Sequence, residues 1–430
     1  MKHIHRRQVL AGAVGIAAAG IAIRTSAASP NGKVSVAVVG VNGRGHSLSR
    51  HLAQRSDTQI MALCDVDQSV RERAAQTVHG INGSKPRLVG DFRQLLHDYT
   101  IDALVIATPH QWHIPMALPA LAAGKDLYLE KPASHVFHEG RLLVDAAKKY
   151  DRIVQHGGQT RSSKVAERAG EILKSGLLGE IKMTKAWNIQ RIEPLQPKPD
   201  GPSPQGVDYD MWLGPAPERR FNANRFHRTW RPYRDYGNGD LGDDGAHDLD
   251  MARWALGAKT HPVRITAHGS TVDLKGEREY PDNMMIAYRY ADEKVLVYED
   301  RIWTPYGMHG FDSGNAFYGT EGYMIFSRRQ HLQVYLGKKE HKGPRMGPEG
   351  LPPPTALHLA DFIESVKNRK QPITPAEDAH LTCGLIHLGE AAFRLERVLH
   401  FDPESETVRD DAEANRLLTK DYRAPWGVTT

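Results

Sequence analysis

The sequence predicts a two-domain α/β protein whose first domain contains a doubly wound parallel sheet. Between residues 33 and 156, short apolar strands alternate with helical segments in the order β-α-β-α-β-α-β. Beyond residue 157, several segments alternate apolar and polar residues, as half-buried strands do. A chain of 430 residues with 40% hydrophobic content can bury two cores. We therefore place the domains at 33–156 and 157–430.

The first strand, residues 34–39, is β-branched and runs directly into a glycine-rich turn. Glycines there let the backbone turn sharply and approach a pyrophosphate, and a helix from about residue 47 to 54 would point its amides at the phosphate charge. The G-x-x-G-x-G spacing is a weak signal alone, and a plain glycine turn is the alternative. In this context it predicts a Rossmann dinucleotide-binding domain with the contacts Gly40, Asn42, Gly43, Arg44 and Gly45.

The second strand, residues 59–64, ends on Asp65. This is close to the ~20-residue offset at which an acidic side chain accepts hydrogen bonds from the adenosine ribose. A carboxylate repels the extra phosphate of NADP, so Asp65 favours NAD as the cofactor. NADP stays open because Arg44 is near enough in sequence to pair with that phosphate.

The remaining elements of the first domain are a helix at 91–98, a strand at 103–108, a helix at 114–123 and a strand at 126–129. The carboxyl ends of parallel strands share one edge of the sheet, where ligands bind. We expect cofactor contacts there from Thr108, Pro109, His110, His113, Glu130 and Lys131. The two histidines could instead cap the next helix, and Lys131 could be a solvated residue that starts a loop.

With these motifs, the chain resembles the Gfo/Idh/MocA oxidoreductases from about Lys33 to its C-terminus. The likeness rests on the glycine loop, on Ala107-Thr108-Pro109, on Glu130-Lys131-Pro132 and on the glycine-rich segment 237–250. That segment aligns with the family pattern at Asp243, Gly245, His247 and Asp250, and departs from it at Asn238, where glycine is frequent.

The resemblance implies a second domain with an open, mainly antiparallel sheet, and hydride transfer at a carbinol carbon of a sugar or polyol. It implies that Lys131 polarises the reacting oxygen, that Asp243 positions substrate and that His247 exchanges the hydroxyl proton. Asp243 and His247 are four residues apart, so in one helix they would share a face, and the carboxylate would raise the proton affinity of the imidazole. A buried structural histidine is the alternative for His247. No Cys or H-E-x-x-H spacing accompanies the cluster, so we assign no metal.

Further substrate contacts are expected from Gln159, Arg161 and Trp187. Gln159 and Arg161 follow a strand end that would face the same cleft, and a guanidinium can donate two hydrogen bonds to sugar oxygens. Trp187 opens a stretch rich in aromatic and polar residues that precedes the histidine motif, and aromatic faces hold sugars. This stretch also contains Trp212, Phe226, His227, Trp230 and Arg231.

The N-terminus predicts a twin-arginine export signal over residues 1–28. Arg6-Arg7 precedes an apolar run at 11–23 and a small-residue segment at 25–29. The run is shorter than the ~20 residues of a spanning helix, so we expect no stable membrane anchor. Twin-arginine substrates cross the membrane folded, so a periplasmic protein of this kind can carry a cofactor loaded in the cytoplasm. Free NAD is scarce outside, so we expect tightly bound, recycled NAD.

Recycling permits two chemistries. One is exchange between two substrates, in which one sugar is oxidised and a second carbonyl is reduced. The other is NAD-dependent glycoside cleavage through a transient keto-sugar, which some relatives perform, although the best known of them lack lysine at the position of Lys131. A sugar-binding protein without turnover is a third possibility, and the lysine and histidine disfavour it.

Composition adds limits. The formal net charge is +5, and four positive charges lie within the first 24 residues without acids, which leaves +1 for the rest, so a nucleic-acid partner is not expected. Cys64 and Cys383 are expected to be isolated core thiols.

Residues 328–354 predict a surface hairpin or lid, and the tail 412–426 is expected to pack on a neighbour or on its own cleft. By resemblance, we expect a homodimer or homotetramer.

Overall fold

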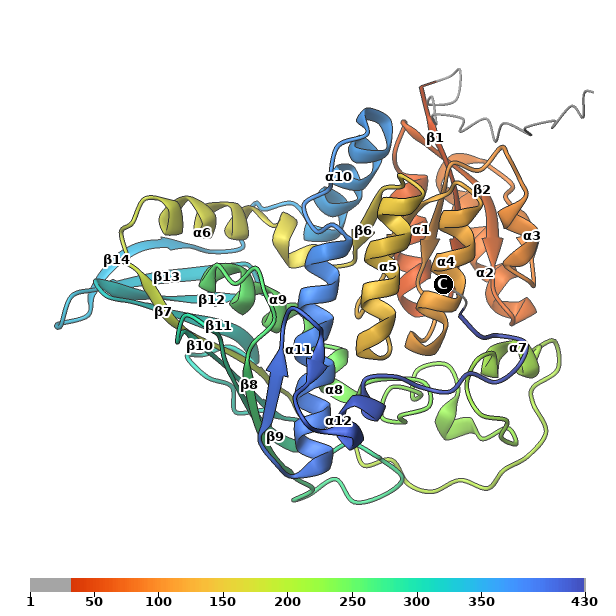
Figure 1. Cartoon of the computed structure of the whole chain (residues 1–430). Helices are drawn as coiled ribbons and strands as arrows, with labels where there is room; N and C mark the ends of the chain where they lie inside the picture. The colour runs from red at the N-terminus through yellow and green to blue at the C-terminus, as the bar shows by residue number, and fades with distance from the viewer. Residues whose placement is uncertain (1–31, 429–430) are drawn as a thin grey trace, which may run out of the picture.

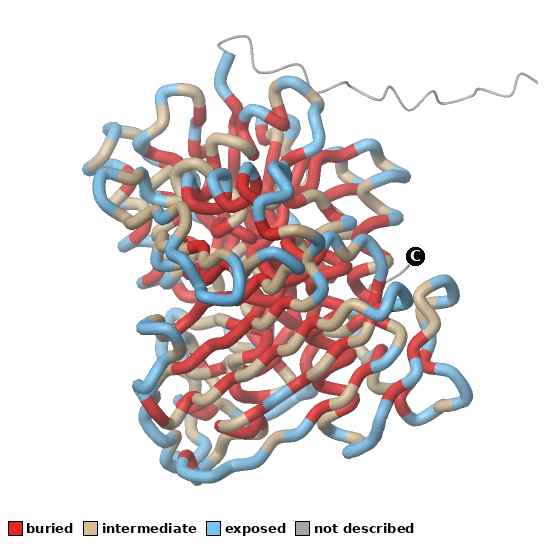
Figure 2. The backbone as a smooth tube through the Cα atoms, turned by 90° about the vertical axis from the view of Figure 1, so that its left-hand side faces the viewer, coloured by how far each residue is buried: buried red, intermediate tan, exposed pale blue. Residues whose placement is uncertain are grey.

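The computed structural model describes residues 32–428 and contains two sheets with their helices (Figure 1). The buried backbone is concentrated along the strands and along the helices that face them (Figure 2). The predicted export signal at residues 1–28 lies outside the described residues. Within residues 32–428, no helix combines the length and the apolar character that crossing a membrane requires.

The first sheet confirms the predicted doubly wound fold. Its six strands are all parallel and lie in the order β3-β2-β1-β4-β5-β6. The order reverses between β1 and β4, and ligands of such sheets bind in the crevice at that point. The strands are β1 (Val34–Val39), β2 (Thr58–Cys64), β3 (Arg87–Val89), β4 (Ala103–Ile106), β5 (Asp126–Leu129) and β6 (Val154–His156).

Helices cover both faces of this sheet because its strands are apolar on both sides. One face packs against α3 (Arg93–Leu96), α4 (His113–Ala122) and α5 (Phe137–Lys149). The other packs against α1 (Gly43–Ala53), α2 (Gln68–Asn82) and α10 (Pro354–Asn368). The helix α10 comes from the C-terminal half of the chain, so the first core recruits residues beyond the predicted boundary at 157.

The second sheet has ten strands in the order β14-β13-β12-β11-β7-β10-β9-β8-β15-β16. Only β7 and β10 pair in parallel, and the other neighbours are antiparallel. The predicted hairpin at 328–354 is the edge pair β13–β14. The strands are β7 (Ile181–Ile189), β8 (Arg264–Ser270), β9 (Asn283–Arg289), β10 (Val295–Arg301), β11 (Ser313–Gly319), β12 (Gly322–Ser327), β13 (His331–Leu336), β14 (His341–Met346), β15 (Leu399–Asp402) and β16 (Thr407–Val408).

The helices α6, α9, α11 and α12 follow the first sheet in the chain, and buried side chains of all four join the cores of the second sheet. They are α6 (Lys164–Lys174), α9 (Gly245–Leu256), α11 (Ala376–Leu395) and α12 (Ala412–Leu417). A short helix, α8 (Gly239–Gly242), precedes α9. Cys64 and Cys383 are free and buried, as predicted.

Residues 190–238, which we call the excursion, leave the second sheet after β7 and lie against the first domain. Besides short turns they contain α7 (Tyr209–Leu213). The Asp208 amide donates to the carbonyl of Val66 at 3.1 Å, and the Gln68 amide donates to the carbonyl of Gly206 at 3.0 Å. The excursion therefore bridges the two domains.

The C-terminal tail packs on its own chain beside the excursion, and none of its residues 412–426 lines the cavity described below. The Arg423 Nε donates to the carbonyl of Gly214 in the excursion at 2.8 Å. The ring of Trp426 lies 4.9 Å from that of Trp112, centroid to centroid. The Trp112 indole in turn donates to the carbonyl of Met211 at 3.0 Å. The tail thus holds the part of the excursion around α7, which we call its base, against the first domain.

Because α10 completes the first core, removing its largest buried side chain should destabilise the nucleotide-binding domain. Phe362 is fully buried in that core. We expect Phe362→Ala to lower the free energy of unfolding by ~3–5 kcal/mol, through lost transfer energy and a cavity. Urea denaturation followed by circular dichroism measures this. The control Tyr306→Ala, at a side chain that is 79% exposed, should change it by less than ~0.5 kcal/mol. An equally small change for Phe362→Ala would contradict the role of α10.

Candidate active site

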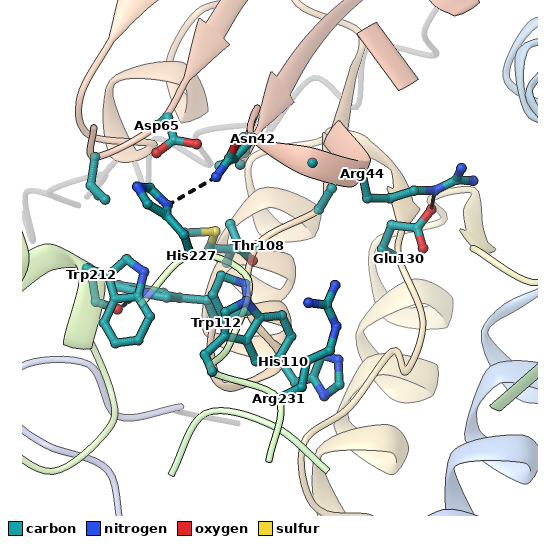
Figure 3. A pocket seen from close by; sticks show the side chains of 18 of the residues that line it. Asn42, Arg44, Asp65, Thr108, His110, Trp112, Glu130, Trp212, His227 and Arg231 are labelled. Atoms are coloured by element: carbon teal, nitrogen blue, oxygen red, sulfur yellow. Dashed lines mark hydrogen bonds and ion pairs between the residues drawn. The ribbon is translucent and has the colours of Figure 1, made fainter. Parts of the chain in front are cut away.

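A cavity of about 610 Å³ lies at the carboxyl edge of the first sheet, with the excursion and the α8–α9 segment forming its other wall. Parallel strands deliver their terminal residues to this edge, and for this reason residues far apart in sequence meet there (Figure 3). The predicted residues that line it are Gly40, Asn42, Gly43, Arg44, Asp65, Thr108, Pro109, His110, Glu130, Lys131, Gln159, Asp243 and His247. Gly45, His113, Arg161 and Trp187 are not among the lining residues.

The glycine loop is shaped for close approach. Gly40 has a φ of +78°, and a Cβ on it would lie 2.8 Å from the backbone of Ala107. A Cβ on Gly45 would lie 1.8 Å from the carbonyl oxygen of Gly40, so Gly45 serves helix–strand packing and does not line the cavity. The helix α1 begins at Gly43, four residues earlier than predicted, so its first amides lie at the cavity wall. An N-terminus of this kind binds pyrophosphate.

Asp65 lies at the end of β2, as predicted. Its Oδ2 accepts from the Val41 amide at 2.8 Å and its Oδ1 from the Asp67 amide at 3.1 Å, which fixes the carboxylate beside the glycine loop. Burial raises its pKa above the usual range. Figure 3 places Asp65 and Arg44 on opposite sides of the cavity, so Arg44 does not stand beside the ribose position. The structure therefore gives the 2′-phosphate of NADP no partner at Arg44.

The hydroxyl group of Thr108 bears on whether this cavity can hold a dinucleotide. Its Oγ1 is buried and has no hydrogen-bond partner, although the residue lines the cavity. Buried hydroxyls are normally paired, so this atom indicates a ligand partner. Together with the glycine loop and Asp65, it fits NAD: the α1 amides would hold the pyrophosphate, Asp65 the adenosine ribose, and Thr108 with Pro109 the nicotinamide side.

The two histidines after β4 have different positions. His110 lines the cavity, and its Nδ1 lies 3.1 Å from Asn238 Oδ1. Burial, with Lys131 and Arg231 nearby, lowers its pKa well below the ordinary value, so the ring is neutral. His113 is fully buried, with its ring nitrogens 2.7 Å from the carbonyl of Pro132 and 3.0 Å from that of Thr108. The prediction that His113 contacts cofactor was wrong, because both nitrogens join two loops behind the cavity wall.

Glu130 organises one end of the cavity. Its Oε1 accepts from Arg44 Nε at 2.8 Å and from Gln159 Nε2 at 2.8 Å. Burial works to raise the pKa of Glu130, but the Arg44 guanidinium and the Lys131 ammonium outweigh it and lower that pKa. Glu130 is thus an anion that fixes Arg44 and Gln159 in place. Gln159 lines the cavity with its amide nitrogen already engaged, which leaves its carbonyl oxygen for a ligand.

Lys131, Asp243 and Arg231 form an ion-paired group across the domain boundary. The Lys131 Nζ donates to the Asp243 carbonyl oxygen at 2.7 Å and also contacts the Asp243 carboxylate. The second carboxylate oxygen lies 2.7 Å from Arg231 Nε. Burial opposes ionisation of Asp243, but Lys131 and Arg231 hold its pKa well below the usual range. The two cations and the carboxylate are therefore charged together at one end of the cavity.

His247 lines the same end of the cavity but is not paired with Asp243. The prediction of a shared helix face was wrong, because α8 ends at Gly242 and α9 begins at Gly245, so Asp243 lies in the junction. The pKa of His247 is lowered well below its ordinary value by burial first, then by the charges of Lys131 and Arg328, while Asp244 partly opposes them. A neutral imidazole with an unpartnered Nδ1 results.

Two further predicted substrate contacts lie elsewhere. Arg161 Nη1 is 3.3 Å from Asp250 Oδ1, and its Nη2 is 3.8 Å from Asp378. Both terminal nitrogens of the guanidinium therefore pair with carboxylates of the second domain. Trp187 is fully buried in β7 and donates from Nε1 to the carbonyl of Phe311 at 3.2 Å. These two predictions were wrong because each side chain points into protein. A strand end does not show which way Arg161 points, and an aromatic-rich stretch does not separate the core residue Trp187 from a ligand contact.

Several cavity residues had no assigned role in the sequence analysis. His227, Trp230 and Arg231 come from the excursion, and Arg228 lines the cavity with them. Their stretch was noted as rich in aromatic and polar residues, which was the available signal. Asp244 lines the cavity too, and its Oδ1 lies 3.0 Å from Arg328 Nη1. No local pattern links Asp244 to Arg328, which follows β12.

One group in the described part of the chain has the composition of a metal site outside this cavity: His261, His380 and Glu406. The two imidazole Nε2 atoms are 3.3 Å apart, and His380 Nε2 is 2.9 Å from Glu406 Oε1. Arg141 Nη2 lies 2.6 Å from that same oxygen. A guanidinium therefore already balances the carboxylate charge, and we assign no metal there.

Comparison with known proteins agrees with this architecture. Residues 34–157 match the family model described as oxidoreductase family, NAD-binding Rossmann fold. Residues 183–314 and 342–428 match the model described as oxidoreductase family, C-terminal alpha/beta domain. The first model spans the first sheet, and the second covers most of the second domain apart from residues 315–341, which include β12 and β13.

Among curated proteins, the chain is 29% identical over 217 residues to a glycosyl hydrolase family 109 protein of Shewanella sp. strain MR-4. It is 28% identical over 217 residues to the alpha-N-acetylgalactosaminidase of Shewanella oneidensis. Each match covers 45% of this chain and 47% of the relative, so the chain spans about half the length of the curated relatives it matches.

Among solved structures, levoglucosan dehydrogenase in complex with NADH has the same fold, with a TM-score of 0.66, 19% identity, and coverage of 85% of this chain and 98% of that one. The aldose-aldose oxidoreductase of Caulobacter crescentus matches with a TM-score of 0.66, 18% identity, and coverage of 86% and 100%. The family models, the two sheets and the glycine loop agree, and the chain belongs to the Gfo/Idh/MocA family of NAD-binding oxidoreductases.

Proposed function

We propose that this protein oxidises a hydroxyl group of a sugar, polyol or glycoside by hydride transfer, and that its NAD stays bound and is recycled. The observation that carries the proposal is that an ammonium, Lys131, and a neutral imidazole, His247, both line one end of the cavity that fits NAD. A cation beside the reacting oxygen and a base for its proton are what oxidation of an alcohol requires.

In this proposal each residue has a separate role. Lys131 donates a hydrogen bond to the reacting oxygen, and Asp243 with Arg231 holds the ammonium in position. His247 accepts the hydroxyl proton at a ring nitrogen, because its lowered pKa keeps the ring neutral. Bound NAD supplies the hydride acceptor. His110 and Gln159 face the same space and can orient further hydroxyl groups.

The names of similar proteins support a carbohydrate substrate. The fold neighbours include a levoglucosan dehydrogenase and an aldose-aldose oxidoreductase, and the curated relatives include an alpha-N-acetylgalactosaminidase. The predicted export signal supports recycling, since a periplasmic enzyme has little free NAD to exchange. Export, location and the homodimer or homotetramer stay predictions from the sequence.

Glycoside cleavage is the second candidate, and the curated relatives favour it. In that reaction, oxidation of one hydroxyl acidifies the neighbouring C–H, the aglycone leaves by elimination, and water addition and reduction complete the cycle. The same neutral His247 and Lys131 would serve its first step. The two candidates differ in whether a leaving group is released.

A first experiment separates the candidates. Purified mature protein, given sugars and glycosides without added cofactor, should develop absorbance near 340 nm if a hydroxyl is oxidised, and a second carbonyl substrate should then remove it. Release of p-nitrophenol from nitrophenyl glycosides, with solvent deuterium entering the sugar ring, would instead identify cleavage. Protein that neither carries nor binds NAD would contradict both.

The catalytic assignments predict large effects at two residues. Lys131→Ala and His247→Ala should each lower turnover at least ~10²-fold, the usual contribution of a positioned acid or base. NAD content, measured by absorbance after denaturation, should stay close to that of the unaltered protein. The control His79→Ala changes an exposed histidine of α2 and should leave turnover unchanged. Near-normal turnover of either active-site variant would overturn its role.

The electrostatics of His247 predict a pH profile. Its pKa is lowered by burial, Lys131 and Arg328, so the base stays neutral where an ordinary histidine is protonated, and turnover should not fall as the pH is lowered through the ordinary histidine pKa of about 6.5. Arg328→Gln removes one of these charges and leaves Asp244 unpaired. Both changes raise the pKa of His247, so the acid limb of kcat should move to higher pH. An unmoved limb in this variant would contradict a titrating His247.

A further inference from the structure

The excursion reaches across the cavity, and one of its side chains, His227, contacts the glycine loop. His227 Nδ1 lies 3.1 Å from Asn42 Nδ2 (Figure 3). His227 Nε2 lies 3.0 Å from Asp67 Oδ2. Asn42 is the residue before α1, and Asp67 follows Asp65 by two positions. His227 therefore joins the segment assigned to the pyrophosphate to the segment assigned to the adenosine ribose.

These contacts form one continuous chain of hydrogen bonds. Arg73 Nη2 donates to Asn42 Oδ1 at 3.0 Å, which turns the Asn42 amide nitrogen towards His227. His227 Nδ1 accepts from that nitrogen, and its Nε2–H donates to Asp67 Oδ2. The other oxygen of Asp67 accepts from the amide of Ser69 at 2.9 Å and caps α2. A neutral imidazole thus satisfies both partners, and the first domain holds each partner in place.

The base of the excursion, around α7, is more deeply buried than the imidazole of His227, which we call its tip. At its base, Trp112 and Trp212 are 2% and 6% exposed, and the tail adds the contact of Arg423. At its tip, the side chain of His227 is 33% exposed, and the residue has a φ of +52°, a conformation that L side chains rarely adopt. Such a conformation persists only where contacts hold it. The tip is therefore the end that can open while the base stays closed.

We propose that His227 is a releasable clasp that keeps NAD in its cavity, so that the Asn42–His227–Asp67 bridge sets how long the cofactor stays bound. A dinucleotide that occupies the cavity lies against Asn42, Asp65 and His227, which all line it. Its departure past the tip requires both hydrogen bonds of His227 to break. The inference rests on the proposed function, which needs a cofactor that is kept through many cycles.

The test measures NADH dissociation directly and does not depend on turnover. Protein loaded with NADH is mixed with a large excess of NAD, and the loss of bound NADH fluorescence gives the dissociation rate. In His227→Gly the backbone keeps its positive φ without strain, so the change isolates the imidazole. We expect a dissociation rate at least ~10-fold higher, since two hydrogen bonds are lost.

A second variant separates the clasp from a general loosening of the excursion. Asn tolerates a positive φ and retains a hydrogen-bonding side chain, so His227→Asn should dissociate NADH at a rate between those of the unaltered protein and His227→Gly. The control His79→Ala lies on the surface of α2 and should match the unaltered protein. Equal rates in all four proteins would overturn the clasp.

The outcomes also distinguish the clasp from the function on which it rests. If the unaltered protein keeps NADH through gel filtration and His227→Gly keeps it equally well, the clasp is wrong and the recycling proposal stands. If the unaltered protein loses NADH within seconds but His227→Gly loses it at least ~10-fold faster, the clasp stands and the recycling proposal is wrong. Rapid loss at equal rates would overturn both.

Discussion

The ion pair between Lys131 and Asp243 connects the two domains at one end of the candidate site. Lys131 follows the last predicted strand of the first domain, and Asp243 lies in the junction before α9 in the second. Charges that are buried together stay charged only if each keeps its partner, and removal of one partner leaves a costly unpaired charge. Docking of the domains therefore pairs Lys131 with Asp243, and Arg231 adds a second, more exposed partner for the same carboxylate.

This arrangement also determines the protonation state of His247. The imidazole lies near an excess of positive charge, because Lys131 and Arg328 outweigh Asp244, and burial acts in the same direction. An isolated histidine would be partly protonated near neutral pH, and a protonated ring accepts no proton. The charges at the domain junction thus favour the neutral His247 that we propose as the base.

The excursion adds a second connection between the domains, at the opposite end of the cavity from Lys131. Long segments without regular structure are uncommon in compact domains and frequently cover binding sites. Here the base of the segment is fixed by Trp112 and the tail, and its tip returns to the glycine loop. A cofactor between these connections lies between both domains, as the proposed retention of NAD requires.

Local sequence patterns were enough to predict the order of strands and helices in the first domain, the glycine loop, Asp65 and the positions of Lys131 and His247. These follow from local patterns, because apolar periodicity marks parallel strands and all of their carboxyl ends meet at one edge. The docked domains were needed to show that Arg161, Trp187 and His113 face protein, that α10 completes the first core, and that Asp243 pairs with Lys131 instead of His247. They also place His227 in the cavity wall and Arg328 beside Asp244. Such contacts join residues tens to hundreds of positions apart, and no local periodicity records where a side chain ends once the domains have docked.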